Sequence, residues 1–114
     1  MASETVEQSV PVLFLWFQNR RKQVLCAELL RSRKVLNAIT EIVFNLLNTI
    51  PLTSQNKKAL LVYANELLLL RNKGQHQKKY QLLAQDPKGK KLLSIILSLS
   101  FPYLLESKSY NGSQ

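Results

Sequence analysis

The chain has 114 residues, 46% of them hydrophobic, so it can bury the core of one domain but not of two. It carries 16 lysine and arginine residues against 7 acidic residues, which gives a net charge of +9 at pH 7. The hydrophobic fraction excludes a wholly disordered chain. The excess of positive charge favours a polyanionic partner, either nucleic acid or an anionic membrane surface. The single cysteine, Cys26, excludes an internal disulfide and cannot form a zinc site alone.

The N-terminal half predicts a tail followed by helices. Residues 1–9 are polar and predict a disordered tail, and residues 10–105 predict a single helical basic domain. Pro11 suits a first helical turn, and no glycine or proline then occurs before Pro51. Apolar residues recur at helical spacing in this span, which predicts helices over 12–30 and 33–49, with a bend at the charged run 31–34.

Pro51 stops this helix, and either Thr53 or Ser54 can cap the next by accepting a bond from a free backbone N–H. That helix is predicted to run to residue 72, where Gly74 is placed to end it. Its expected apolar face consists of Leu60, Leu61, Ala64, Leu67 and Leu68. A short helix over 75–85 and a turn over 86–89 are predicted to follow.

The segment Leu92 to Leu105 is apolar on nearly all sides. It is shorter than the roughly 20 residues that a membrane-spanning helix needs, and Pro102 interrupts it. It predicts a buried closing helix that folds back on the apolar faces of 35–47 and 60–68. The alternatives are self-association or contact with a membrane surface. The polar residues 106–114 predict a flexible tail.

Together these segments predict an all-α fold, either a loose helical hairpin or a small three- to four-helix bundle with disordered termini. The sequence offers no catalytic constellation. His76 lies in a polar stretch and is interpreted as a solvated surface residue, the acids are far apart, and the three glycines form no phosphate-binding loop. No metal-ligand spacing occurs. We therefore expect no enzyme activity, no cofactor, no metal and no small-molecule substrate.

Basic residues recur near the predicted helix ends and turns. Between residues 20 and 91 there are 15 basic and 4 acidic residues. The basic ones are Arg20, Arg21, Lys22, Arg31, Arg33, Lys34, Lys57, Lys58, Arg71, Lys73, Lys78, Lys79, Lys88, Lys90 and Lys91. Such clusters neutralise phosphates and release counterions, which predicts salt-sensitive binding of nucleic acid, above all double-stranded DNA, without regard to sequence. A solvated face is the alternative interpretation.

The string from Trp16 to Lys22, Trp-Phe-Gln-Asn-Arg-Arg-Lys, resembles the recognition-helix signature of homeodomains. The resemblance implies that Asn19 pairs with adenine, that Gln18 reads a neighbouring base, and that the arginines hold phosphate. Trp16 and Phe17 would then face the core. A homeodomain has two helices before this point, whereas only 15 residues precede Trp16. Sequence-specific DNA binding by a homeodomain-derived fragment is therefore an alternative function.

A second resemblance covers about 70 residues, from Leu36 to Leu105. Its elements are Ile42 to Leu47, Ile50 to Thr53, Lys57-Lys58, Tyr63, Leu67, Lys78-Lys79, Leu82-Leu83 and Gln85. In this order they resemble the small basic proteins of Polinton and adintovirus-type elements, which are similar to adenovirus core protein X. The resemblance implies a virion-associated protein that condenses DNA.

The chain departs from that family at Asp86 to Lys91, where the usual glycine pair is missing.

Acidic residues, not basic ones, precede the apolar stretch Val10 to Phe17, so no signal peptide is predicted. We expect an intracellular protein, nuclear or virion-associated, and not a secreted one.

Overall fold

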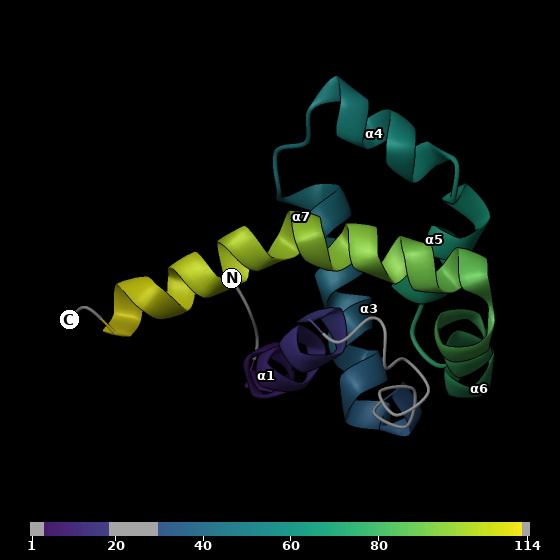
Figure 1. Cartoon of the computed structure of the whole chain (residues 1–114), viewed down its shortest axis with the longest axis horizontal. Coiled ribbons are helices and arrows are strands. Elements are labelled where there is room, and N and C mark those ends of the chain that lie inside the picture. Colours follow the sequence, from purple (N-terminus) through teal and green to yellow (C-terminus); the bar gives the residue numbers. More distant parts are fainter. Residues whose placement is uncertain (1–3, 19–29, 113–114) are drawn as a thin grey trace.

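The elements of the fold are all helices within the residues that the structure describes. The computed structural model describes residues 4–18 and 30–112, with 105–112 described by their backbone alone. The elements are α1 (Glu4–Gln18), α3 (Arg33–Asn48), α4 (Ser54–Leu61), α5 (Ala64–Arg71), α6 (His76–Tyr80), the π-helical segment η3 (Gln81–Gln85) and α7 (Pro87–Gly112) (Figure 1). The predicted all-α class is confirmed.

Short polar side chains begin two of these helices. The Oγ atom of Ser32 accepts a hydrogen bond of 3.4 Å from the backbone N–H of Val35, at the start of α3. The Oγ1 atom of Thr53 accepts one of 3.1 Å from the N–H of Asn56, at the start of α4. Pro51 lies between the two helices, so the predicted break and the Thr53 cap are both confirmed.

The chain reverses between α5 and α6 at two consecutive residues with positive φ angles. Gly74 has a φ of 81° and Gln75 a φ of 54°. Glycine adopts this left-handed conformation without the steric cost that a side chain brings, which explains why a glycine stands at this point. The reversal lets α6 return to pack against α3.

The prediction of a disordered tail over residues 1–9 was wrong for residues 4–9. Helix α1 begins at Glu4 and already contributes Val6, Ser9 and Val10 to the interior. Polar residues surround these positions in the sequence, but Val6 and Val10 are four apart and so lie on one face of a helix. Pro11 consequently lies inside α1 and not in its first turn.

Helix α7 begins earlier and ends later than the sequence indicated. Residues 86–89 were expected to form a turn, yet only Asp86 precedes the helix, and Pro87 occupies its first position. The Oδ1 atom of Asp86 accepts a 2.9 Å hydrogen bond from the N–H of Lys88. The helix continues past Pro102 and through residues 106–112, which were expected to be a flexible tail.

Gly89 allows α7 to approach η3 closely. A Cβ atom built on Gly89 would lie 1.8 Å from the carbonyl oxygen of Leu82. No side chain fits at this distance, and a backbone carbonyl cannot move away cheaply. The glycine therefore fixes how the start of α7 packs on η3.

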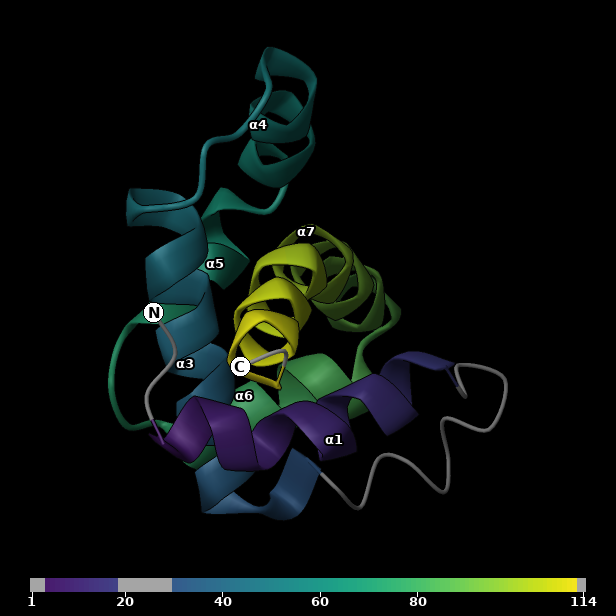
Figure 2. The same ribbon diagram turned by 90° about the vertical axis from the view of Figure 1, so that its left-hand side faces the viewer.

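The helix predicted over 53–72 is broken into α4 and α5 at Val62 and Tyr63. The break turns the two helices relative to one another and divides the expected apolar face. Leu60 and Leu67 are buried, whereas Leu61 and Leu68 remain 70% and 53% exposed. Helix α4 consequently projects from the rest of the molecule in both views (Figures 1 and 2).

The core lies where α7 crosses α1 and α3 (Figure 2). The buried side chains of α7 are Leu92, Leu93, Ile96, Leu97, Ser100 and Phe101. The ring of Phe101 meets Phe14 and Phe17 of α1 edge to face, with centroid distances of 5.3 and 5.5 Å. The predicted fold-back is therefore confirmed for the 35–47 face on α3, whereas α1 takes the place that was expected for the 60–68 face.

The resulting bundle has a radius of gyration of 13.4 Å. A compact domain of this length is expected to have a radius of about 13 Å, so the bundle form of the fold prediction applies and the loose hairpin does not. No helix within the described ranges is long and apolar enough to cross a membrane.

Candidate nucleic-acid interface

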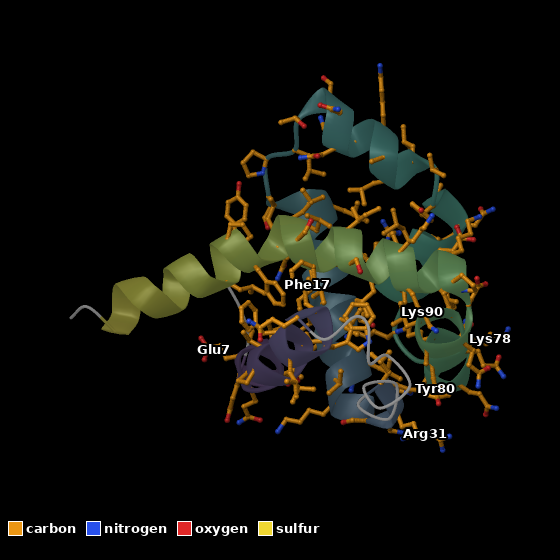
Figure 3. The ribbon with its side chains drawn as sticks, in the orientation of Figure 1. Glu7, Phe17, Arg31, Lys78, Tyr80 and Lys90 are labelled. Atoms are coloured by element: carbon orange, nitrogen blue, oxygen red, sulfur yellow. The ribbon has the colours of Figure 1, made fainter. Side chains whose placement is uncertain are left out.

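Helix α1 and the segment 71–91 carry opposite charges and lie on different sides of the molecule (Figure 3). Helix α1 contains Glu4 and Glu7 but no lysine or arginine. Residues 71–91 contain seven lysine and arginine residues and one acid, Asp86. Figure 3 places Glu7 on one side of the molecule and Lys78, Lys90 and Arg31 on the other. We call the latter side, formed by the start of α3, by α6 and by the start of α7, the basic end.

An open polar groove of about 550 Å³ crosses the basic end between α3 and α6. Its polar side chains come from Arg31, Arg33, His76, Gln77, Tyr80, Gln81 and Gln85. Guanidinium groups bind phosphates through several parallel hydrogen bonds, and amides and an aromatic ring interact with bases and sugars. The groove thus combines residue types that nucleic-acid interfaces use.

Two contacts hold the walls of this groove together. The Nε atom of Arg31 donates to the hydroxyl of Tyr80 at 3.3 Å, and the guanidinium carbon lies 5.2 Å from the centre of the Tyr80 ring. The Nε2 atom of His76 lies 2.9 Å from the Oδ1 atom of Asn37 on α3. Residues far apart in sequence are therefore fixed at hydrogen-bond distance, which keeps α6 in register with α3. His76 is partly exposed at the surface, as the sequence indicated, and its ring is in addition held by the exposed contact with Asn37.

Three glutamines that were not among the predicted site residues line the polar groove. Gln77, Gln81 and Gln85 follow one another at intervals of four residues through α6 and η3. Residues four apart face the same side of a helix, so the spacing was visible in the sequence. The predicted contact residues in this stretch were all lysines and arginines, and the glutamines were not among them.

Lys79 was expected to contact phosphate, but the structure places it inside the bundle. Its side chain is 1% exposed, and its Nζ atom donates to the Oγ1 atom of Thr40 at 2.7 Å and to the carbonyl oxygen of Asn72. Burial lowers the pKa of the Lys79 ammonium from its ordinary value of 10.5, because the charged form loses its hydration. Lys79 therefore joins α3 to α6, and the prediction for this residue was wrong.

Raising the pH is expected to stabilise the wild-type protein relative to a Lys79→Met variant. The pKa of Lys79 is lower in the folded than in the unfolded state, so between the lowered value and 10.5 the unfolded state binds more protons. The stability cost of the buried charge is complete below this window and disappears as the pH rises through it. Urea unfolding of both proteins between about pH 7 and pH 10.5 measures the difference. A free-energy difference that is constant or falls with pH would contradict this account.

The other predicted contact residues divide into two groups. The first group lies on the three segments that form the basic end. Its exposed members are Arg31, Arg33, Lys34, Lys78 and Lys91, and Lys90 is half-buried. Lys57 and Lys58 are exposed on α4, and Arg71 and Lys73 are exposed at the end of α5. The fold therefore does not gather all the predicted cations on one face.

Lys88 is partly occupied by contacts within the protein. Its Nζ atom lies 3.4 Å from the Oε2 atom of Glu66 and 5.9 Å from the centre of the Tyr63 ring. Both partners come from the segment around α5, so Lys88 ties α7 to it. An exposed ion pair of this kind contributes little stability, and the lysine can still reach an anion.

Part of the homeodomain-like string lies outside the described residues. Asn19, Arg20, Arg21 and Lys22 belong to the range 19–29, as does Cys26. Gln18 is exposed as the last residue of α1. Trp16 is buried in the core and Phe17 is half-buried against Phe101.

Comparison of the chain with protein-family models, with curated protein sequences and with solved structures finds no match in any of the three. Within the described ranges, no three histidine, cysteine, aspartate or glutamate residues come together in a way that could hold a metal ion.

Proposed function

We propose that the protein binds nucleic acid without catalysing a reaction, and that its basic end contacts the phosphates of double-stranded DNA. The observation that carries the proposal is the polar groove itself. It lies at the basic end, Arg31 and Arg33 line it, and the guanidinium of Arg31 lies against the ring of Tyr80, which lines it together with the three glutamines. A purely solvating surface does not require such an arrangement.

The positions of the cations on their helices support the same proposal. Arg33 and Lys34 lie in the first turn of α3, and Lys88 and Lys90 in the first turn of α7. The N-terminus of a helix carries partial positive charge, so cations there are destabilising by up to about 1 kcal/mol each. A bound phosphate would be attracted both by the side chains and by the helix ends, which offsets this cost.

The biological setting that we propose is the condensation of DNA in a virion or mobile element, in an intracellular, nuclear or virion-associated protein. It rests on the resemblance to the small basic proteins of Polinton-type elements. Condensation requires binding to any sequence, and this agrees with a surface of lysines, arginines and amides on a compact bundle. The membrane alternative would require Leu92, Leu93 and Ile96 to leave the core.

The experiment compares two labelled duplexes, one of random sequence and one carrying a homeodomain-type site, in fluorescence anisotropy titrations at low salt. We expect micromolar-range affinity for both, of the kind that phosphate contacts alone provide. Asn19→Ala should leave both affinities unchanged. A loss of about 1–3 kcal/mol that is confined to the homeodomain-type site would favour the sequence-specific alternative. Absence of binding to either duplex at low salt would overturn the proposal.

A further inference from the structure

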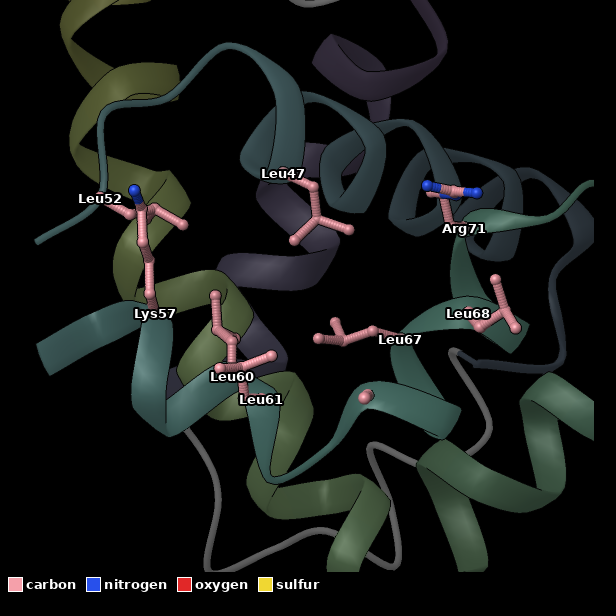
Figure 4. Close-up of a pocket in the computed structure, with 9 residues that line it drawn as sticks. Leu47, Leu52, Lys57, Leu60, Leu61, Leu67, Leu68 and Arg71 are labelled. Carbon is pink, nitrogen blue, oxygen red and sulfur yellow. The ribbon is translucent and has the colours of Figure 1, made fainter. Parts of the chain in front are cut away.

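A second groove lies away from the basic end, between the end of α3 and the α4–α5 pair (Figure 4). Its volume is about 410 Å³ and most of its wall is apolar. Leu47 comes from α3, Leu60 and Leu61 from α4, and Leu67 and Leu68 from α5. We call it the leucine groove.

The leucine groove exposes apolar surface that the fold itself does not cover. Leu61 is 70% exposed and Leu68 is 53% exposed, although both are large apolar side chains. The neighbouring Val62 is 69% exposed. Single exposed leucines are common on proteins, but several around one hollow mark a binding surface.

The charges at the groove determine what kind of partner fits it. Figure 4 shows Lys57 near one end and Arg71 near the other, with Leu47, Leu60 and Leu67 between them. No acidic residue belongs to the described wall. A complementary ligand is therefore apolar in its middle and negatively charged at both ends.

We propose that the leucine groove binds an amphipathic helix of a partner protein, with leucine-like residues on one face and an acidic residue near each end. A helix laid in an apolar groove presents side chains at positions i, i+3, i+4 and i+7, which matches a row of leucines flanked by two cations. A fatty-acid-like molecule has one carboxylate and would leave one cation without a partner. The proposal is independent of nucleic-acid binding.

A second copy of the chain fits the groove poorly. Symmetric pairing of two grooves would bring Lys57 and Arg71 of both copies together, and like charges repel. Helix α1 is the acidic, apolar helix of this chain, but its Val6, Leu13 and Trp16 are buried in its own core. It would have to leave that core in order to act as the ligand.

The test uses the full chain and a labelled synthetic peptide of about four helical turns, with leucines at the spacing above and a glutamate near each end. Fluorescence anisotropy measures its affinity. The double variant Leu61→Ser, Leu68→Ser should weaken binding roughly tenfold or more, because it removes exposed apolar contact area without emptying the core. Leu15→Ser is the matched control, since Leu15 is 49% exposed on α1, outside the groove.

Charge reversal distinguishes this groove from a generally sticky surface. The variant Lys57→Glu, Arg71→Glu should lose the acidic peptide and gain a peptide that carries lysines in place of its glutamates. The Leu61→Ser, Leu68→Ser variant should keep the affinity of the wild type for duplex DNA. Equal binding of the acidic peptide to wild type and to the leucine variant would overturn the proposal. So would stronger leucine-dependent binding to laurate or to anionic vesicles, or a wild-type dimer that the leucine variant abolishes.

Discussion

Reversing Arg31, Arg33 and Lys78 to glutamate is expected to lower the affinity for random-sequence duplex DNA about a hundredfold at moderate salt. The three side chains are exposed on the basic end, and the two arginines line the polar groove. Each reversal removes a cation that releases counterions and adds an anion that repels the phosphates. Anisotropy titration at one fixed salt concentration measures the loss, because affinities at different salt concentrations cannot be compared.

The matched control reverses Lys57, Lys58 and Arg71, which changes the net charge by the same amount on the side of α4 and α5. The residues changed in the two variants are all exposed, so neither set of reversals opens a cavity in the core. We expect the control to lose clearly less affinity than the basic-end variant. Equal losses would mean that total charge alone determines binding and that the polar groove has no special role.

Trp16→Ala is expected to lower the free energy of unfolding by about 3–5 kcal/mol, the range for truncating a large aromatic residue in a core. Trp16 is 1% exposed on α1, in the core formed with α3 and α7. A domain of this kind has a total stability of only about 5–15 kcal/mol, so the variant should be close to unfolding. Urea unfolding followed by circular dichroism measures the change.

Phe44→Ala serves as the comparison, since Phe44 is 53% exposed on α3. Removal of the Phe44 ring leaves no cavity, so we expect the free energy of unfolding to fall by less than about 1 kcal/mol. The comparison also tests whether Trp16, the first residue of the homeodomain-like string, contributes to the core. If Trp16→Ala were as mild as Phe44→Ala, α1 would not be an integral part of the core.

The helices of the middle of the chain could be predicted because each has a local signal. Apolar residues recur at helical spacing in α3, Pro51 and Thr53 separate it from α4, and Gly74 takes a left-handed conformation in the loop after α5, whose C-cap is Asn72. These signals lie within a few residues of the feature that they specify. The physical chemistry of the local sequence is therefore enough to predict these features.

The failures have long-range causes. Residues 4–9 look polar, and they become helical because Val6 and Val10 reach a core that other helices provide. The break at Val62 separates Leu61 and Leu68 from the buried leucines, although the spacing alone predicts one face. Prolines at 11 and 102 lie inside helices, although a proline there removes a backbone hydrogen bond.

The candidate site was predictable in its composition and not in its arrangement. The excess of lysine and arginine predicts a polyanionic partner, but no local pattern distinguishes the buried Lys79 from the exposed Lys78 beside it. The contacts of Arg31 with Tyr80 and of His76 with Asn37 join residues that are 49 and 39 positions apart. Only the folded chain brings them together to form the polar groove.

The most direct test of the central proposal is the salt dependence of binding to random-sequence duplex DNA. If about six phosphates are contacted, the slope of log affinity against log salt concentration should be roughly −5. The variant with Arg31, Arg33 and Lys78 reversed should give a slope shallower by about 2 to 3, since each lost contact contributes about 0.9. A wild-type slope near zero, or one that the three reversals leave unchanged, would contradict nucleic-acid binding through the basic end.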